Sequence, residues 1–308
     1  MANDPIYYSA SGDIRATEAL HQEIQLLLAD RASLRGHPAI LQFGDLAGSG
    51  STVRSVPFFG LDGYDEMAAV AENASVSRTD PTDASADITI ARQALRYSIS
   101  DLNNMVDSVG LNVERLAASM VGAAEMRFTS MICGVLDDFT STVGSTGVDL
   151  DVDDFYDAIY TLEEANANGP FTAVLHPVQV TDLQNSLRAE GGAVQYKPAT
   201  QDMLEAKGQG FIGQFAGVDI YKSSKVPTAN TAADRAGAMF ARGAVGFAEG
   251  TPRPMAMFGG QLVLAAGTPI LVEFDRTPEG ALTDIVGSYY VGVQKLQDAL
   301  GVSIITDA

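Results

Sequence analysis

The stretch NVERLAASMVGAAEMRFTSMICGVL, residues 112–136, carries the clearest helical pattern in the chain. Apolar side chains recur at steps of three and four residues, as along one face of an α-helix: Val113, Leu116, Met120, Ala124, Phe128, Met131 and Val135. With Asn112 as its cap, a helix over 113–136 would be roughly 36 Å long. Three further positions widen the apolar face, namely Ala117, Val121 and Ile132. We therefore expect this helix to pack both on a sheet and on a neighbour.

Residues 52–100, before this helix, are predicted to be mainly extended. Val53, Val56 and Phe58 open one extended segment, and a polar, turn-rich stretch over 73–86 separates it from a second one over 87–100. We interpret the whole as a long two-stranded ribbon, which is marginal alone and needs a partner surface. Within the second segment the alternation of apolar residues changes parity between positions 90 and 95, which predicts a bulge or twist there.

The N-terminal part combines a helical pattern with a loose linker. Residues 15–34 carry apolar side chains at helical spacing and end at the breaker Gly36-His37-Pro38. The arm-like stretch 43–52 follows and is rich in Gly and Ser. Residues 1–10 show no basic segment followed by an apolar one, so no signal peptide is evident.

Beyond a Ser/Thr/Gly-rich break at 140–147, helical and strand patterns alternate up to about residue 250. The predicted elements are a helix at 152–165, a strand at 171–175, a helix at 177–189, a Gly-rich section at 208–217, and strands at 218–222, 238–241 and 245–248, with a loop at Pro227. The rest is predicted to be strand-rich, at 254–258, 262–265, 270–275 and 285–293, with a turn at Pro278-Glu279-Gly280.

The composition excludes several classes of protein. The chain of 308 residues is 46% hydrophobic with a formal net charge of −20, which predicts a folded protein of two packed subdomains. Gripping nucleic acid through its phosphates needs a surplus of Lys and Arg, so charge-driven DNA or RNA binding is not expected. The longest apolar run, Leu262 to Val272, is too short to span a bilayer. The single cysteine, Cys133, lies in an apolar helical run and is predicted to be a buried, inert thiol.

The segment GVDLDVDDFYDAIYTLEE, residues 147–164, has aspartates at alternate positions, as calcium loops do. In a loop starting at Asp149, position 6 is Asp154 instead of Gly, and position 12 is Tyr160 instead of Glu. The pattern predicts a helix start instead, with Asp149 or Asp151 as the cap and further aspartates in the first turn. Behind them an apolar stripe is formed by Phe155, Ile159 and Leu162.

Three other motifs are weak candidates for a catalytic or nucleotide site. GQGFIG, residues 208–213, follows a helical pattern and precedes a strand, the reverse of a dinucleotide-binding loop, so a flexible loop is predicted. GDLAGSGST, residues 44–52, lacks the lysine of a phosphate-binding loop and is predicted to be a hinge-like linker. His176 precedes Asp182 and Ser186, but those two share a helix face with each other. No catalytic, cofactor-binding or metal-binding residue is therefore assigned, and no enzyme is predicted.

The order of these elements resembles the major capsid proteins of tailed bacteriophages, over essentially the whole chain. FTAVLHPVQVTDLQNSL, residues 171–187, looks like the strand and helix of that family's axial domain. GQFAGVDIYKSSKVP, residues 213–227, is similar to the strand and loop that follow there. ILVEFDRTPEGALTDIVGSYYVGVQKLQDALGVSII, residues 270–305, looks like the closing strands of the peripheral domain.

The resemblance implies an α+β fold and a role for each segment. Residues 1–49 would be the N-terminal arm, 50–99 the extended loop over an adjacent subunit, 100–144 the spine helix with the first part of the peripheral domain, 145–249 the axial domain, and 250–308 the peripheral strands. The implied function is a structural protein that forms hexamers and pentamers of an icosahedral shell around double-stranded DNA, assembled in the host cytoplasm. We expect the acidic charge to keep the shell wall from adhering to the packed DNA.

Two family features are absent, and both shape the expected partners. Some relatives cross-link their shells by a Lys–Asn bond from the extended loop, but residues 50–99 contain no lysine, so a noncovalent shell is predicted. Others carry a scaffolding segment before the arm, whereas here the arm starts almost at Met1, so we expect a separate scaffold protein. A portal and a decoration protein are further expected partners. No membrane is expected as a partner.

Two alternative functions remain open from the sequence. One is the shell of a bacterial encapsulin-type nanocompartment, which has the same fold and packages an enzyme; the long polar stretch at 60–86 favours the viral reading. The other is a cytosolic α/β enzyme that uses residues 145–250, with His176 or the glycines from Gly208 as its site.

Overall fold

The computed structural model describes residues 34, 37–46, 50–59, 69, 70, 72, 75, 76, 83–101, 112–189, 196–207, 210–251, 262–264 and 270–307. Its helices are α3 (Asn112–Leu136), α4 (Val152–Glu164), α5 (Pro177–Ala189) and α6 (Gln201–Lys207), with short 3-10 turns η3 (Asn230–Ala232), η4 (Pro278–Gly280) and η5 (Asp298–Leu300). Its strands are β1 (Leu41–Phe43), β2 (Val53–Phe59), β3 (Asp83–Thr89), β4 (Ala91–Ser100), β5 (Thr142–Val143), β6 (Thr172–Leu175), β7 (Tyr196–Pro198), β8 (Phe211–Phe215), β9 (Val218–Lys222), β10 (Thr228–Ala229), β11 (Asp234–Phe240), β12 (Val245–Glu249), β13 (Leu262–Leu264), β14 (Ile270–Thr277), β15 (Leu282–Lys295) and β16 (Gly301–Asp307).

The long strand β15 organises a sheet of six described strands, ordered β1-β12-β15-β14-β13 with β4 also on β15. The hairpin β14–β15 turns through η4, where Ala281 takes a left-handed backbone conformation (φ 47°), so the predicted turn at Pro278–Gly280 is confirmed. Residues 282–289 of β15 pair with β14 and also with β4, which places these two strands on opposite edges of β15.

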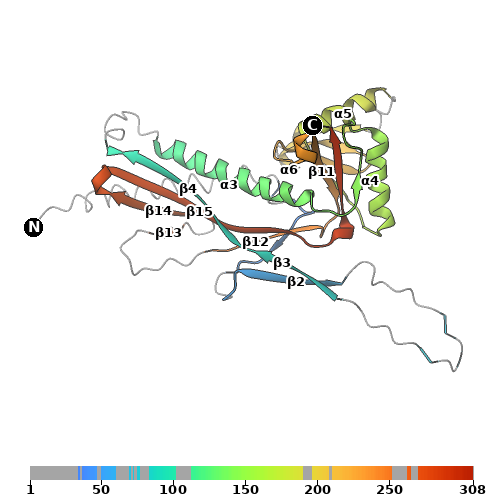
Figure 1. The fold of residues 1–308 in the computed structure, drawn as a ribbon, viewed down its shortest axis with the longest axis horizontal. Helices are drawn as coiled ribbons and strands as arrows, with labels where there is room; N and C mark the ends of the chain where they lie inside the picture. Colours follow the sequence, from blue (N-terminus) through green and yellow to red (C-terminus); the bar gives the residue numbers. More distant parts are fainter. Residues whose placement is uncertain are drawn as a thin grey trace, which may run out of the picture.

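A second sheet contains eight described strands, ordered β5-β16-β11-β6-β9-β8-β7, with β10 on β11. The central strand β6 is buried along its whole length and runs parallel to β9, as an interior strand rich in apolar residues does. Helices α4 and α5 pack beside this sheet, near the C-terminal end of the chain (Figure 1). The main core lies here and includes the rings of Phe155, Phe215 and Phe240.

Helix α3 joins the two sheets, and its predicted extent is confirmed almost to the residue. Met120 and Val121 pack with Ile270, Val272 and Ile285 of the six-stranded sheet. Farther along the helix, Phe128, Ile132 and Leu136 enter the main core. Figure 1 shows α3 running along β4, β14 and β15 and ending at the eight-stranded sheet. One helix thus supplies an apolar face to both halves of the molecule.

The two sheets divide the chain differently from the boundaries expected at 145–249 and 250–308. Strand β12, expected with the α/β region, belongs to the six-stranded sheet. The last strand, β16, returns to the eight-stranded sheet and pairs with β11 over seven residues. The physical reason is that strand partners are set by long-range packing. The order of elements along the chain, which suggested a boundary near residue 250, does not show which strands pair.

The predicted two-stranded ribbon is only half correct. Strands β2 and β3 form an antiparallel pair from Val53↔Thr89 to Phe59↔Asp83, and Figure 1 shows this pair projecting from the body. Strand β4, which was expected to continue the ribbon, instead pairs with ten residues of β15. Ile90 separates β3 from β4, and its N–H donates to the carbonyl of Thr52. The predicted change in the alternation of apolar residues therefore begins at Ile90, where the chain stops pairing with β2 and starts pairing with β15.

The remaining predictions divide into those confirmed and those outside the described residues. The helices at 152–165 and 177–189 are confirmed by α4 and α5, and the strands at 171–175, 218–222 and 245–248 by β6, β9 and β12. The strand at 238–241 begins earlier, as β11, and those at 262–265, 270–275 and 285–293 appear as β13, β14 and β15. Two predictions lie outside the described residues. One is the strand expected at 254–258, and the other is the helix expected within 15–34, of which only Leu34 is described.

Candidate functional site

The aspartates at 149–154 begin helix α4. Asp151 is the N-cap, and its Oδ1 accepts a hydrogen bond of 2.8 Å from the backbone N–H of Asp154. Phe155 and Leu162 are buried and Ile159 packs against the same core, so the predicted apolar stripe is confirmed. Burial and the neighbouring Asp151 carboxylate raise the pKa of Asp154 above its usual range. The described residues contain no group of three or more His, Cys, Asp or Glu side chains placed to hold a metal ion.

His176 precedes helix α5 and makes local contacts. Its Nδ1 accepts from the N–H of Val178 at 3.4 Å, and burial with the nearby Arg235 charge lowers its pKa. The Ser186 hydroxyl accepts from the N–H of Val152, which ties α5 to the start of α4. Within the described chain, no hydrogen bond joins His176 to Asp182 or Ser186. These three side chains therefore do not form a hydrogen-bonded catalytic triad in this structure.

Gln179, a buried glutamine three residues after His176, makes more hydrogen bonds than His176 does. Gln179 is 0% exposed, and its Nε2 donates to the carbonyls of Arg235 and Ile304 and to the Thr306 hydroxyl at 2.9–3.1 Å. Its Oε1 accepts from the N–H of His176 at 3.0 Å. The amide thereby connects α5 to β11 and β16. The polar residues here serve the stability of the eight-stranded sheet.

The motif GQGFIG was expected to be a flexible loop, and this expectation is wrong for its second half. Phe211–Phe215 form strand β8, which pairs with both β7 and β9. Phe211 and Phe215 are buried, and burial of these rings against the sheet outweighs the preference of glycine for loops. Lys207 precedes the motif, and its Nζ lies 2.7 Å from the Asp219 carboxylate and 4.8 Å from the centre of the Phe211 ring.

Cys133 is buried as expected, and its Sγ contacts the Ser223 hydroxyl at 3.6 Å. Burial raises the pKa of its thiol to about 11, so the nucleophilic thiolate is scarce near neutral pH. The linker at 44–52 is described in part: Leu46 is buried and its N–H donates to the carbonyl of Glu249. This end of the predicted linker is thus anchored to the body.

The surface that stands out is the ribbon β2–β3. It is a sheet of two described strands, and Val53, Arg54 and Ser55 are exposed on its first strand. Its half nearest the body packs on the chain's own core: Ile88 is fully buried with Leu46, Ala248 and Leu296, and the mid-ribbon pair Val56 and Ala86 packs against the same cluster. An isolated pair of strands is at best marginally stable in water, so this ribbon is suited to lie against another surface.

The ribbon base crosses β15 closely, and a glycine makes this possible. A Cβ at Gly292 would collide with the backbone carbonyl of Thr89. Because that carbonyl belongs to the backbone, it cannot move aside as a flexible side chain would. Gly292 therefore allows β3 to cross β15 at close range.

An ionic network fastens β4, the continuation of the ribbon, to β15. The buried carboxylate of Asp284 accepts from Arg96 and Ser98 of β4, and from the Thr277 hydroxyl at 3.3 Å. These hydrogen bonds, led by the one from Arg96, hold the pKa of Asp284 below its usual range. Nearby, Arg276 binds both carboxylate oxygens of Asp101 at 2.7 and 2.9 Å, which lowers the pKa of Asp101. Strand β4 is thus fastened to β15 toward its end at Ser100.

No protein-family model matches the chain, and no curated protein matches it. Several solved structures do match. The capsid of Cyanophage P-SCSP1u is 15% identical, with 87% of this chain and 86% of that chain covered and a TM-score of 0.59. The capsid of Ralstonia phage GP4 is 12% identical, with 88% and 87% covered and a TM-score of 0.59. The SrpI encapsulin of Synechococcus elongatus PCC 7942 is 14% identical, with 87% and 85% covered and a TM-score of 0.61.

The chain therefore has the α+β fold of tailed-phage major capsid proteins, as its element order predicted. The SrpI encapsulin shares this fold. No described helix is long and apolar enough to cross a membrane.

Sequence reasoning found the ribbon and missed the residues that hold it in place. The alternation of Leu95, Tyr97 and Ile99 was visible, but its partner strand was not. Arg96 and Asp284 are 188 positions apart, and nothing local in either sequence context indicates their contact. The one available signal was the arginine and serine pattern on the polar face of residues 92–98.

Proposed function

We propose that the protein is the structural subunit of an icosahedral shell, which self-assembles through hexamers and pentamers and encloses a double-stranded DNA genome. The ribbon β2–β3 carries this proposal, since it projects from the body and its contacts with the chain's own core are made by its nearer half, up to the Val56–Ala86 pair. A second copy of the chain is the surface that would cover it, and the likeness to phage capsids supports this choice of partner. Many modest interfaces between copies would then add up to a stable shell.

The segment roles follow the two sheets. We assign the eight-stranded sheet, including β16, to the axial domain at the centre of each capsomer, and the six-stranded sheet to the peripheral domain. Residues 1–49 would act as an arm to a neighbour, and the ribbon within 50–99 as the extended loop. Helix α3 would transmit force between the two domains, because it packs on both cores.

The shell would be noncovalent and would contain DNA without binding its sequence. Residues 50–99 hold no lysine, so a Lys–Asn cross-link from this stretch is chemically unavailable. The net charge of −20 repels phosphate backbones, which suits an inner wall that must not adhere to packed DNA. A ladder of cross-linked subunits on a denaturing gel would contradict the noncovalent shell. Tight binding of the subunits to duplex DNA at physiological salt would contradict the role of the charge.

Further partners belong to the same proposal. We expect a separate scaffold protein, a portal and a decoration protein, with assembly in the host cytoplasm and no enzymatic activity of the subunit itself. Co-expression of the subunit with its neighbouring genes, followed by purification of assembled particles, tests these partners. A shell of uniform size from the subunit alone would remove the need for a scaffold.

The nanocompartment alternative is favoured by one observation, the match to SrpI encapsulin with a TM-score of 0.61. Negative-stain microscopy of particles from the native source separates the two functions. Shells with a tail or with DNA inside support the viral function, and shells with protein cargo select the compartment. The absence of any shell would overturn both.

The ribbon itself is tested by shortening it. Arg54 and Ile88 are paired across the two strands, so residues 55–87 are replaced by Asn-Gly, which closes a two-residue hairpin at this register. We expect a folded subunit that forms no shells, with a modestly lower melting temperature because Val56 and Ala86 no longer pack on the core. The matched control is Val53→Thr, which keeps a β-branched residue at the ribbon base and should still assemble. Normal shells from the shortened chain would refute the role of the ribbon.

A further inference from the structure

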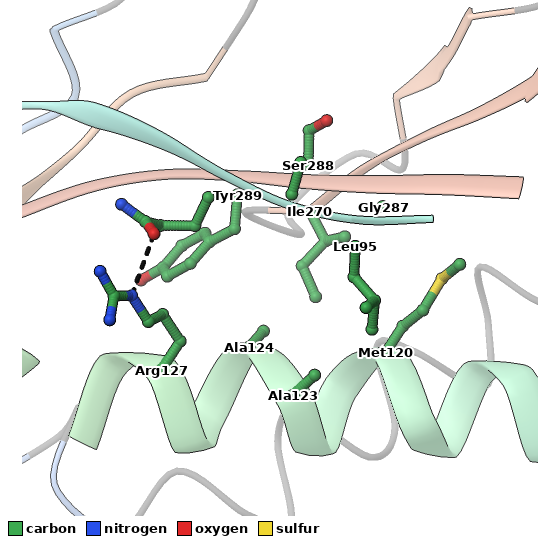
Figure 2. A pocket seen from close by; sticks show the side chains of 11 residues that line it. Leu95, Met120, Ala123, Ala124, Arg127, Ile270, Gly287, Ser288 and Tyr289 are labelled. Carbon is green, nitrogen blue, oxygen red and sulfur yellow. Dashed lines mark hydrogen bonds between the residues drawn. The ribbon is translucent and has the colours of Figure 1, made fainter. Parts of the chain in front are cut away.

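A cavity lies between helix α3 and the six-stranded sheet, apart from the ribbon. It encloses about 210 Å³ and is lined by residues from β4, β14 and β15 on one side and from α3 on the other. Figure 2 shows the sheet above the cavity and the helix below it, with Ala123 and Ala124 pointing toward the sheet. The side chains of these two alanines are too short to fill the space. Gly287, across from Met120, adds no side chain on the sheet side.

Most of the lining is apolar. Met120 closes one end, and Leu95 and Ile270 form part of the wall. Two polar residues of the lining have hydrogen-bond partners for their hydroxyl groups. The Ser288 hydroxyl accepts from Arg92 on the opposite face of the sheet, and the Tyr289 hydroxyl donates to Glu249 at 2.6 Å. The body of the cavity thus offers contact to carbon and sulfur atoms.

The other end carries a charge with unused donors. The Nε of Arg127 donates to the Gln93 amide oxygen at 3.0 Å, as the dashed line in Figure 2 shows. Among the described residues, this guanidinium makes no other side-chain hydrogen bond or ion pair. A guanidinium presents a planar set of donors that matches a carboxylate in a bidentate geometry.

The space is partly open to solvent, but water in its apolar part finds few polar partners. An ordered water needs two to four polar partners, and an apolar cavity of about 150 Å³ stays dry and binds benzene. The cavity here is larger than that, and its polar groups gather at one end only. Its shape and chemistry suit a molecule with a compact apolar body and one acidic group.

We propose that this cavity is a binding site for a small aromatic or branched carboxylate, with the ring between Ala124, Leu95 and Ile270 and the carboxylate on Arg127. The ligand would bridge α3 to β4 and β15, so its binding would stabilise the contact between the helix and the sheet by mass action. The site is independent of the shell function, and it can be tested on the unassembled subunit.

The probe is 4-fluorobenzoate, followed by ¹⁹F NMR with the purified full chain, with fluorobenzene as its neutral analogue. We expect a broadened and shifted signal for both probes with the wild-type chain. Arg127→Gln should weaken 4-fluorobenzoate binding by about tenfold and leave fluorobenzene unaffected, because it removes a charge-assisted contact only. Arg127 is exposed, so this variant should fold normally.

Two further variants decide whether the cavity is the site. Ala124→Leu fills the cavity from the helix and should abolish binding of both probes, while Ala206→Leu makes the same change on the exposed face of α6 and should alter neither. Melting temperatures confirm that each variant is folded. No signal change with the wild-type chain overturns the proposal, and so does undiminished binding to folded Ala124→Leu.

Discussion

The ribbon β2–β3 and the eight-stranded sheet are both β-structure, yet they satisfy their backbone and side chains in different ways. In the eight-stranded sheet, β6 and β11 are buried between neighbouring strands, and Gln179 supplies hydrogen bonds from a helix. In the ribbon, each strand has one described partner and Val53 is 38% exposed. The difference indicates that one region stabilises the subunit and the other is available to a second copy. Four experiments can sharpen this contrast, from the largest expected effect to the smallest.

The largest effect is expected in the core of the eight-stranded sheet. Phe155 is fully buried against Phe215, so Phe155→Ala should lower the free energy of unfolding by about 3–5 kcal/mol. The matched change in the ribbon, Phe58→Ala, removes a half-buried ring and should cost about 1 kcal/mol or less. Chemical denaturation of unassembled subunits measures both. Equal losses would show that the ribbon belongs to the folding core.

The buried amide of Gln179 should have the next largest effect. Gln179→Leu keeps the volume but leaves the carbonyls of Arg235 and Ile304 without this donor, which should cost about 1–3 kcal/mol. Gln201→Leu is the control, because Gln201 is exposed and bonds only to Glu205 at the surface. Denaturation midpoints of the two variants give the comparison. If Gln179→Leu were neutral, the network would contribute nothing to the sheet.

The attachment of β4 to β15 should depend on pH. The pKa of Asp284 is lowered in the folded state, so its stabilising effect is complete above the ordinary carboxyl pKa of about 3.9 and is lost as the pH falls through the lowered value. Asp284→Asn should therefore be less stable than the wild-type chain at pH 7. The gap should close as the pH falls below about 4. Melting temperatures from pH 7 to pH 2 measure it, and a gap that stays constant across this range would contradict the role of the charge.

The smallest effect on stability should accompany a large effect on assembly. Val53→Asp places a charge on the exposed ribbon and should change the free energy of unfolding by less than about 0.5 kcal/mol. Shell yield, counted by electron microscopy, should fall sharply. Val148→Asp makes the same change at a residue that is 50% exposed beside the eight-stranded sheet, and it should assemble better than Val53→Asp. The reverse ranking would move the interface away from the ribbon.

Local signals predicted several elements well. Helix α3 follows from apolar spacing alone, and α4 follows from Asp151, whose side chain caps the first turn wherever the helix is placed. The turn at Pro278–Gly280 has the same local origin. The candidate surface was partly predictable, since the extended pattern of the residues that form β2 and β3 is visible in the sequence before their pairing is known.

Partner choice could not be predicted from the same signals. Strand β4 looks like the continuation of β3, and Phe211–Phe215 look like part of a glycine loop, yet both are paired within the large sheets. The Asp284 network, the Gly292 crossing and the cavity below Gly287 all join segments far apart in the chain.

The sequence by itself therefore determined the helices, the turn and an acidic chain with no lysine in residues 50–99, because these depend on neighbours within a few positions. Only the tertiary structure decided that β16 joins the eight-stranded sheet beside β11 and that β4 pairs with β15 instead of continuing the ribbon. Strand pairing is chosen by the burial of whole faces, and any alternating strand has the local pattern to join more than one sheet.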